Sequence, residues 1–206
     1  MFSFKMVKTD NNRFLFPDEW KAFLKDIKKR NNKLLYEIQF HTGARFDEAI
    51  HLRSMDFDFE RGNVRLWKTK VKATKGEKVG KPRTISISPE FLKKVKKFCK
   101  GKPRDKFLFN ISLAGYNQLL KRSLARIDVN GKKVEAPKEY SSHNIRKTHG
   151  MYLKALGIDV GEICTRLGHD VDTYIQHYGS ADVFSEKDMR GIRDLLGSLY
   201  QRQRRF

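Results

Sequence analysis

The chain has 206 residues, of which 39% are hydrophobic, so it is long enough to bury one substantial core. It carries 44 Lys and Arg against 24 Asp and Glu, a formal charge of +20, and such an excess favours a nucleic-acid partner. No apolar run approaches the ~20 residues of a membrane-spanning helix. A secretory signal is missing, and Cys99 and Cys164 lack metal-ligand spacing. These features argue against membrane and disulfide-scaffold proteins and predict a reduced, cytoplasmic protein that works in the compartment where DNA is.

Apolar residues at helical spacing predict a mainly helical domain. Residues 1–15 are expected to form an arm or linker stub, and the first helix is expected from Pro17, which suits the first helical position. Ser88 is the expected cap of another helix, and an amphipathic helix is expected from about Phe184. The remaining helices are expected at 33–42, 46–53, 112–127, 142–156 and 159–167.

One small sheet interrupts these helices. Residues 63–71 and 83–88 are expected to be strands, since Ile85 and Ile87 alternate with polar residues. Their connection, VKATKGEKVGKP, has the composition of an exposed hairpin loop. Residues 128–140 are expected to form a loop with a turn at Asn130-Gly131. The predicted class is therefore α+β, mainly α, with a small antiparallel sheet.

Four segments carry the groups that a side-chain nucleophile needs to cleave a phosphodiester. Such a reaction requires a hydroxyl, cations that neutralise the phosphate oxygens, and a general acid for the leaving oxygen. Arginine suits the phosphate because its planar fork donates two parallel hydrogen bonds. The segments are HTGARFDEAIHLR at 41–53, the strand LWKTKVK, SSHNIRKTHG at 141–150 and TRLGHDVDTYIQHYGS at 165–180.

Taken singly, each segment is weak. Arg45 follows a glycine turn at a helix start, where N–H groups favour anions, but a lone arginine is usually a surface residue. His143 and Arg146 are three residues apart and share a helix face, which is also common by chance. A tyrosine such as Tyr178 is more often a packing residue than a nucleophile. The combination and its order therefore carry the functional hypothesis.

In this combination the sequence closely resembles the tyrosine recombinase family. TGARFDEAIHLRSMDFD is similar to that family's first arginine box, and HNIRKTHGMYL to its H-x-x-R box. LGHDVDTYIQHY is similar to its LGH box, with the nucleophile nine residues after the histidine. The resemblance covers about residues 14–182. It implies a catalytic domain at 16–182, followed at 183–206 by an amphipathic helix and a basic tail.

The resemblance implies a role for each matched residue. Tyr178 would attack the scissile phosphate and form a 3′-phosphotyrosyl link. Arg45 and Arg146 would clamp the non-bridging oxygens, while His143 and His169 would assist by hydrogen bonding and proton transfer.

The general acid of the family is a lysine in the sheet hairpin. Lys70, at the end of the first expected strand in a Thr-Lys step, is the first choice. Lys68 would share its strand face and is second. Lys72 and Lys75 also lie nearby.

The resemblance further implies a site-specific DNA recombinase or integrase that needs neither metal nor cofactor. Double-stranded DNA is the expected partner, with four copies assembling on it and a monomer when free. The expected source is a virus or plasmid of a prokaryotic host, archaea included. The apolar stripe of the last helix, Ile192 to Leu199, is expected to dock either on its own domain or on a neighbouring copy.

The sequence departs from the family at three places: the hairpin loop is long, Lys147 stands where many members have histidine, and no core-binding domain is expected before Phe16. Two alternative functions stay open, a non-catalytic basic DNA-binding module and an enzyme resembling type IB topoisomerases or telomere resolvases. The acidic residues Asp56, Asp58 and Glu60 suggest a metal-dependent nuclease as a further alternative, although an acidic turn before the hairpin is the favoured interpretation. Tyr174 is an alternative nucleophile for which packing is favoured.

Overall fold

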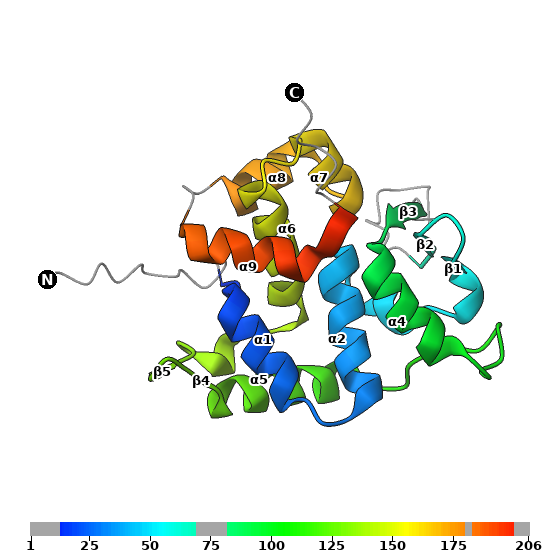
Figure 1. Ribbon diagram of the computed structural model, residues 1–206, viewed down its shortest axis with the longest axis horizontal. Helices are drawn as coiled ribbons and strands as arrows, with labels where there is room; N and C mark the ends of the chain where they lie inside the picture. Colours follow the sequence, from blue (N-terminus) through cyan, green and yellow to red (C-terminus); the bar gives the residue numbers. More distant parts are fainter. Residues whose placement is uncertain (1–12, 69–81, 180–182, 200–206) are drawn as a thin grey trace, which may run out of the picture.

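The computed structural model describes residues 13–68, 82–179 and 183–199 (Figure 1). Most of these residues are helical, and the sheet is small, so the predicted fold class is confirmed. The helices are α1 (Pro17–Asp26), α2 (Arg30–Thr42), α3 (Phe46–Ile50), α4 (Pro89–Cys99), α5 (Leu113–Arg126), α6 (Ser142–Ala155), α7 (Val160–Leu167), α8 (Val171–Tyr178) and α9 (Glu186–Leu196). Within the described part of the chain, none of them has the length and apolarity to cross a membrane.

Helices α2 and α6 pack against each other through the middle of the molecule (Figure 1). Every residue of α2 from Leu34 to Phe40 is buried, because α6 packs against this helix and rings from α1 and α5 contact Tyr36. The ring of Trp20 on α1 stacks on Phe40 at 4.4 Å between centroids. The buried hydroxyl of Tyr36 donates to the Tyr116 carbonyl at 2.7 Å, so the ring is buried without an orphaned polar group.

The segment just before α1 belongs to this core. Phe14 and Leu15, which the sequence placed in an arm, are 3% and 0% exposed. The Leu15 N–H donates to Thr148 Oγ1 at 3.0 Å, and the Tyr152 hydroxyl donates to the Leu15 carbonyl at 2.8 Å. Both backbone polar groups of Leu15 are thus satisfied by α6, which permits their burial.

The sheet has the order β1 (Phe57–Asp58), β2 (Asn63–Leu66) and β3 (Arg83–Ser86), and both pairs are antiparallel. Val64 pairs with Ile85 and faces the core, whereas Arg65 is exposed. The predicted strand 63–71 ends at Leu66 as far as the structure describes it, and its residues 69–71 lie outside the described part of the chain. The chain leaves the ladder after Leu66, where the Trp67 indole turns to donate to Asp56 Oδ2 at 3.1 Å.

Three further expectations need correction. The helix predicted over 46–53 ends at Ile50, because Leu52 and Arg53 instead pair with the segment at Phe107–Leu108. The loop predicted over 128–140 contains a two-stranded hairpin, β4 (Asp128–Val129) and β5 (Lys132–Lys133). Its turn is Asn130-Gly131, where both residues have positive φ. Helix α8, which carries Tyr178, was not assigned from the sequence.

The last helix, α9, packs on its own chain across α1 (Figure 1). Ile192 and Leu196 are 0% and 2% exposed. Gly191 lies so close to α1 that a Cβ there would be 2.8 Å from Pro17 Cβ. Two residues of the apolar stripe predicted for this helix, Ile192 and Leu196, are therefore covered within the chain, whereas Leu195 and Leu199 are partly exposed.

Candidate active site

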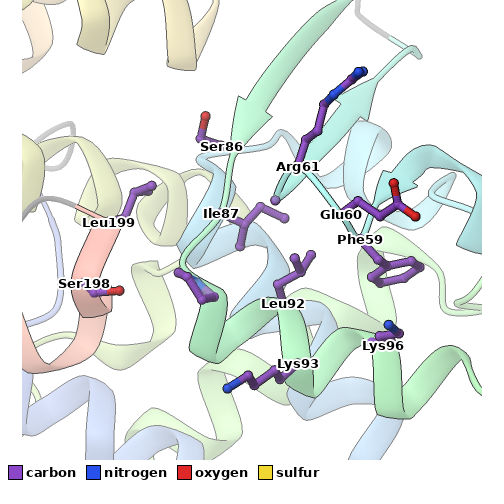
Figure 2. Close-up of a pocket in the computed structure, with 12 residues that line it drawn as sticks. Phe59, Glu60, Arg61, Ser86, Ile87, Leu92, Lys93, Lys96, Ser198 and Leu199 are labelled. Carbon is purple, nitrogen blue, oxygen red and sulfur yellow. The ribbon is translucent and has the colours of Figure 1, made fainter.

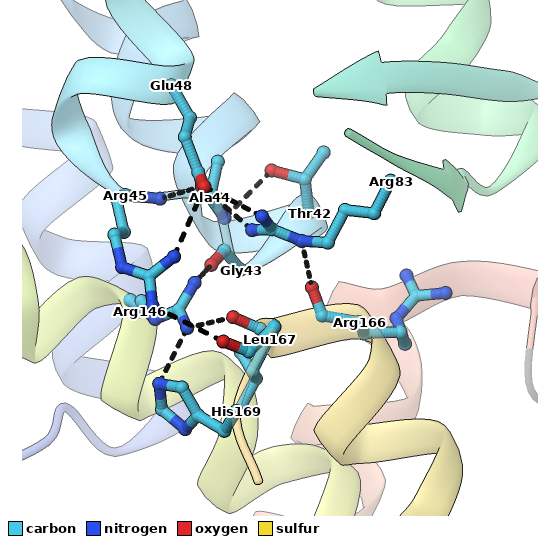
Figure 3. A network of polar contacts seen from close by, with 11 residues as sticks. Thr42, Gly43, Ala44, Arg45, Glu48, Arg83, Arg146, Arg166, Leu167 and His169 are labelled. Atoms are coloured by element: carbon cyan, nitrogen blue, oxygen red, sulfur yellow. Dashed lines mark hydrogen bonds and ion pairs between the residues drawn. The ribbon is translucent and has the colours of Figure 1, made fainter. Parts of the chain in front are cut away.

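Helix α6 carries two of the six predicted site residues and places Arg146 deep inside the molecule. Its side chain is 1% exposed, yet both terminal nitrogens of its guanidinium have acceptors. Nη1 donates to the Gly43 carbonyl at 2.6 Å, and Nη2 donates to the Leu167 carbonyl and to His169 Nε2, the latter at 2.7 Å (Figure 3). Burial, then the nearby charge of Arg45, lowers the pKa of Arg146 to about 9. The arginine therefore remains protonated at neutral pH in a fixed orientation.

Gly43 explains how its carbonyl reaches this position. It ends α2 with φ at +64°, a conformation that favours glycine. A Cβ there would lie 2.7 Å from both His149 Cδ2 and Leu167 Cδ2. Only glycine fits both the backbone conformation and the space, so the turn between α2 and α3 is locked beside α6 and α7.

The LGH segment forms the end of α7. Gly168 terminates the helix with φ at +60°, and His169 follows it. Because arginine can only donate, His169 Nε2 must be an acceptor, and the neutral imidazole carries its proton on Nδ1. Burial, then the charges of Arg146 and Arg45, lowers the pKa of His169 to about 3, which agrees with a neutral ring.

Arg45 starts the short helix α3 and belongs to a second polar network (Figure 3). Its Nη2 donates to the Gly168 carbonyl at 3.4 Å, and its side chain is 27% exposed. The Arg45 N–H at this helix start is already bound, because Glu48 Oε2 accepts from it at 2.7 Å. Any anion at this position would therefore meet the guanidinium rather than this amide.

Glu48 is the centre of that network. The Arg83 guanidinium on β3 donates to both of its carboxylate oxygens at 2.7 Å, and Arg83 Nε donates to the Arg166 carbonyl at 2.8 Å. Burial acts to raise the pKa of Glu48, but the hydrogen bonds and charge of Arg83 outweigh it and the pKa lies below its usual value. The ion pair thus ties the sheet to α3 and to the end of α7.

Tyr178 is the last residue of α8, a helix that begins where Asp170 Oδ1 accepts from the Thr173 N–H at 2.7 Å. The residue is 3% exposed, and its ring stacks on Tyr174 at 5.4 Å between centroids. Burial raises the pKa of Tyr178 to about 12, although Arg146 acts in the opposite direction. The phenol is consequently protonated in the free protein.

A hollow of about 170 Å³, the Tyr178 hollow, brings the segments together. Four predicted site residues line it, although they are up to 35 positions apart in sequence: His143, Arg146, His169 and Tyr178. Arg45 does not line the hollow but contacts Gly168, directly before His169. His143 is exposed, and desolvation followed by the charges of Arg146 and Arg45 lowers its pKa.

Several residues in and around this site were not predicted to belong to it, although Lys147 had been noted where many family members have histidine. Lys147 and His177 line the Tyr178 hollow beside the matched residues. Each directly follows or precedes a motif residue, which is the one sequence signal that pointed to them. Glu48 and Arg83 support Arg45, but a pair 35 residues apart leaves no signal in a single sequence.

Of the four lysines considered as the general acid, the structure describes only Lys68. Lys68 lies against α3, where its Nζ is 2.6 Å from His51 Nε2 and 3.9 Å from Asp47 Oδ1, and it does not line the Tyr178 hollow. Because β2 ends at Leu66, the shared strand face that favoured Lys68 does not exist. Lys70, Lys72 and Lys75 lie outside the described residues.

Two residues of the acidic cluster considered for a metal, Asp56 and Asp58, have structural partners. Arg53 binds Asp56 through two hydrogen bonds of 2.9 and 3.1 Å. Asp58 Oδ1 accepts from the backbone N–H groups of Glu60 and Arg61 at 3.1 and 2.9 Å. These carboxylates therefore hold the acidic turn before β2, the interpretation that the sequence favoured.

A larger hollow, about 530 Å³, lies between the sheet, α4 and the end of α9 (Figure 2). Its polar lining includes Arg61, Lys93 and Lys96, with Glu60 and Ser198. It contains none of the histidine and tyrosine side chains that the chemistry needs. Size alone therefore does not identify the reactive site in this molecule.

The Arg83–Glu48 ion pair is expected to contribute to the stability of the fold. Replacing Arg83 with methionine removes the bidentate partner of the buried Glu48 carboxylate and leaves it only the longer contact with Arg45, so the free energy of unfolding should fall by about 3 kcal/mol. Urea denaturation measures this change. Arg65→Met is the matched control, because Arg65 is exposed on the neighbouring strand and should change stability by less than about 0.5 kcal/mol. A loss below about 1 kcal/mol in Arg83→Met would contradict a structural role for the pair.

Comparison with known proteins agrees with this arrangement. The sequence profile described as "Phage integrase family" matches residues 13–183. No curated protein sequence matches the chain significantly. Among solved structures, the catalytic domain of bacteriophage HP1 integrase superposes with a TM-score of 0.59 at 20% identity, covering 81% of this chain and 86% of that chain.

Two other structures extend the likeness. The Tn1549 transposon integrase in complex with a circular intermediate DNA has a TM-score of 0.67 at 18% identity, covering 96% of this chain and 68% of that one. XerA recombinase has a TM-score of 0.60 at 18% identity, covering 94% and 66%. The chain therefore belongs to the phage integrase family and has the catalytic-domain fold of the tyrosine recombinases.

Proposed function

We propose that this chain cleaves and rejoins DNA strands as a site-specific recombinase through a covalent 3′-phosphotyrosyl intermediate, with Tyr178 as the nucleophile. The observation that carries the proposal is the Tyr178 hollow, where a phenol lies among Arg146, His143 and His169. Membership of the phage integrase family supports the same activity. The formal charge of +20 supplies the attraction to phosphates that DNA binding needs.

The proposed cleavage step assigns one task to each group. The Tyr178 oxygen forms a bond to phosphorus while the bond from phosphorus to the 5′ oxygen breaks. Arg45 and Arg146 neutralise the non-bridging oxygens as their charge grows. His169 Nε2 is occupied by Arg146, so His143, which is exposed and lines the same hollow, is proposed to accept the phenol proton. Lys70 is proposed to protonate the leaving 5′ oxygen, and rejoining is the reverse reaction.

We also propose that four copies assemble on DNA and that the free chain is a monomer. The monomer is supported by the burial of Ile192 and Leu196 within the chain itself, because these two residues of the apolar stripe then need no partner. Several similar structures are complexes with DNA, among them XerH recombinase bound to its difH substrate. Sedimentation velocity with and without DNA measures both states, and a free dimer or tetramer would contradict the proposal.

The function is tested by trapping the covalent intermediate. The protein is incubated in EDTA with a pool of nicked duplexes of randomised sequence. Cleavage near the nick releases a short fragment that carries the free 5′ hydroxyl, and its loss by diffusion prevents rejoining. An SDS-resistant protein–DNA adduct is expected, and sequencing its DNA identifies the preferred site. An adduct that requires magnesium, or no adduct from any sequence, would overturn the proposal.

The general acid is tested with a leaving group that needs no proton. Lys70→Ala should slow cleavage of ordinary DNA by at least about a hundredfold, the usual contribution of a general acid. A substrate with sulfur at the 5′ bridging position should largely restore the rate, which gel assays of adduct formation measure. Lys68→Ala is the control and should cleave both substrates normally. Sulfur rescue of Lys68→Ala or a Lys75 variant, without rescue of Lys70→Ala, would show that another lysine is the acid.

A further inference from the structure

The Tyr178 ring, at the end of α8, packs against one face of α6. Lys147, Gly150 and Lys154 form that face. The three residues are spaced by three and four positions and therefore share a face of the helix. Lys147 Nζ lies 5.5 Å from the centroid of the Tyr178 ring, and Lys154 Nζ donates to the Tyr178 carbonyl at 2.6 Å. Gly150 lies between these two contacts, directly under the phenol.

The phenol touches the helix only because residue 150 has no side chain. A Cβ at Gly150 would lie 2.5 Å from Tyr178 Cε1, 2.8 Å from Cζ and 3.0 Å from the hydroxyl oxygen. All three nearest atoms thus belong to Tyr178. Ordinary contact would require the ring to move by about 1 Å, and Tyr174 is stacked beside it at an angle of 21°.

The backbone gives no other reason for a glycine at this position. Gly150 is in the interior of α6, and its φ is not positive. Glycine in a helix interior costs about 1 kcal/mol relative to alanine. Alanine at position 150 would thus stabilise the helix itself, and its unfavourable effect would be on the position of the Tyr178 ring.

We propose that Gly150 is a positioning residue for the nucleophile, which sets how deep the Tyr178 phenol lies beside Arg146 and His169. The expected effect on catalysis rests on the proposed function, whereas the close contact between Gly150 and Tyr178 is observed in the structure. A nucleophile displaced by about 1 Å from its productive position commonly loses one to two orders of magnitude in rate.

The test is Gly150→Ala. Cleavage of the selected nicked duplex in a single turnover should slow by about ten- to a hundredfold, with unchanged DNA affinity and a stability equal to or above that of the wild type. NMR of protein labelled with [¹³Cζ]tyrosine should show a shifted Tyr178 signal, assigned by its loss in Tyr178→Phe. Gly115→Ala on α5, where a Cβ meets the Ser112 hydroxyl at 3.3 Å, is the control and should leave both rate and signal unchanged.

A Gly150→Ala protein that cleaves at the wild-type rate with an unmoved Tyr178 signal would overturn the proposal. If Gly150→Ala destabilises the fold, the change is repeated in Tyr178→Ala, where the ring is absent. Alanine at 150 should then be neutral or stabilising, and a loss of stability there would show that Gly150 serves helix packing instead. If the wild type forms no adduct, the proposed function fails, while the NMR and stability results still decide whether Gly150 seats Tyr178.

Discussion

Replacing Tyr178 with phenylalanine is expected to abolish the covalent adduct, lowering the cleavage rate by at least about 10⁴-fold. The change removes only the hydroxyl that attacks phosphorus, and the ring keeps its contacts with Tyr174 and Gly150. DNA affinity should stay within about twofold, because it comes mainly from Lys and Arg contacts to phosphates. Adduct yield on denaturing gels and binding by fluorescence anisotropy measure the two effects separately.

Tyr174→Phe is the matched control for this change. Tyr174 lies one helical turn earlier on α8, is 7% exposed and stacks on Tyr178, so its ring is a packing group of the same helix. Its phenylalanine variant should form adduct at close to the wild-type rate. Adduct formation by Tyr178→Phe together with its loss in Tyr174→Phe would transfer the nucleophile to Tyr174.

The order of the motifs predicted the site better than any single residue did. Arg45, His143, His169 and Tyr178 are unremarkable alone, and the fold brings three of them around one hollow with Arg146. The sequence could predict this because each motif couples a reactive residue to a local structural signal. Gly43 and Gly168 are such signals, since each ends a helix with positive φ and presents its carbonyl to an arginine.

Contacts between distant segments were beyond the reach of local patterns. Nothing in the composition of residues 1–15 showed that Leu15 would find two hydrogen-bond partners on α6. Likewise, alternation predicted β3 but not the pairing of Arg83 with Glu48. The C-terminal end of β2 was missed for a related reason, because the Trp67 indole binds Asp56 eleven residues earlier in the chain.

Replacing either arginine of the site is expected to slow cleavage by at least about a hundredfold, the loss of one strong transition-state contact. The two variants should differ in stability. Arg45 is partly exposed, so Arg45→Ala should fold normally. Arg146→Ala instead leaves the buried carbonyls of Gly43 and Leu167 without their donor, at a cost of about 1 to 3 kcal/mol for each group.

Lysine should rescue both positions poorly, because a point charge cannot replace the planar fork that Arg146 directs at two carbonyls and a histidine. Arg53→Ala is the control, since Arg53 lies in the same sequence box but binds Asp56 away from the Tyr178 hollow. Its cleavage rate should stay within about threefold of the wild type. Single-turnover rates, measured at a temperature where urea curves show each variant folded, separate chemistry from stability. An Arg45→Ala or Arg146→Ala rate within threefold of the wild type would remove that residue from the proposed phosphate clamp.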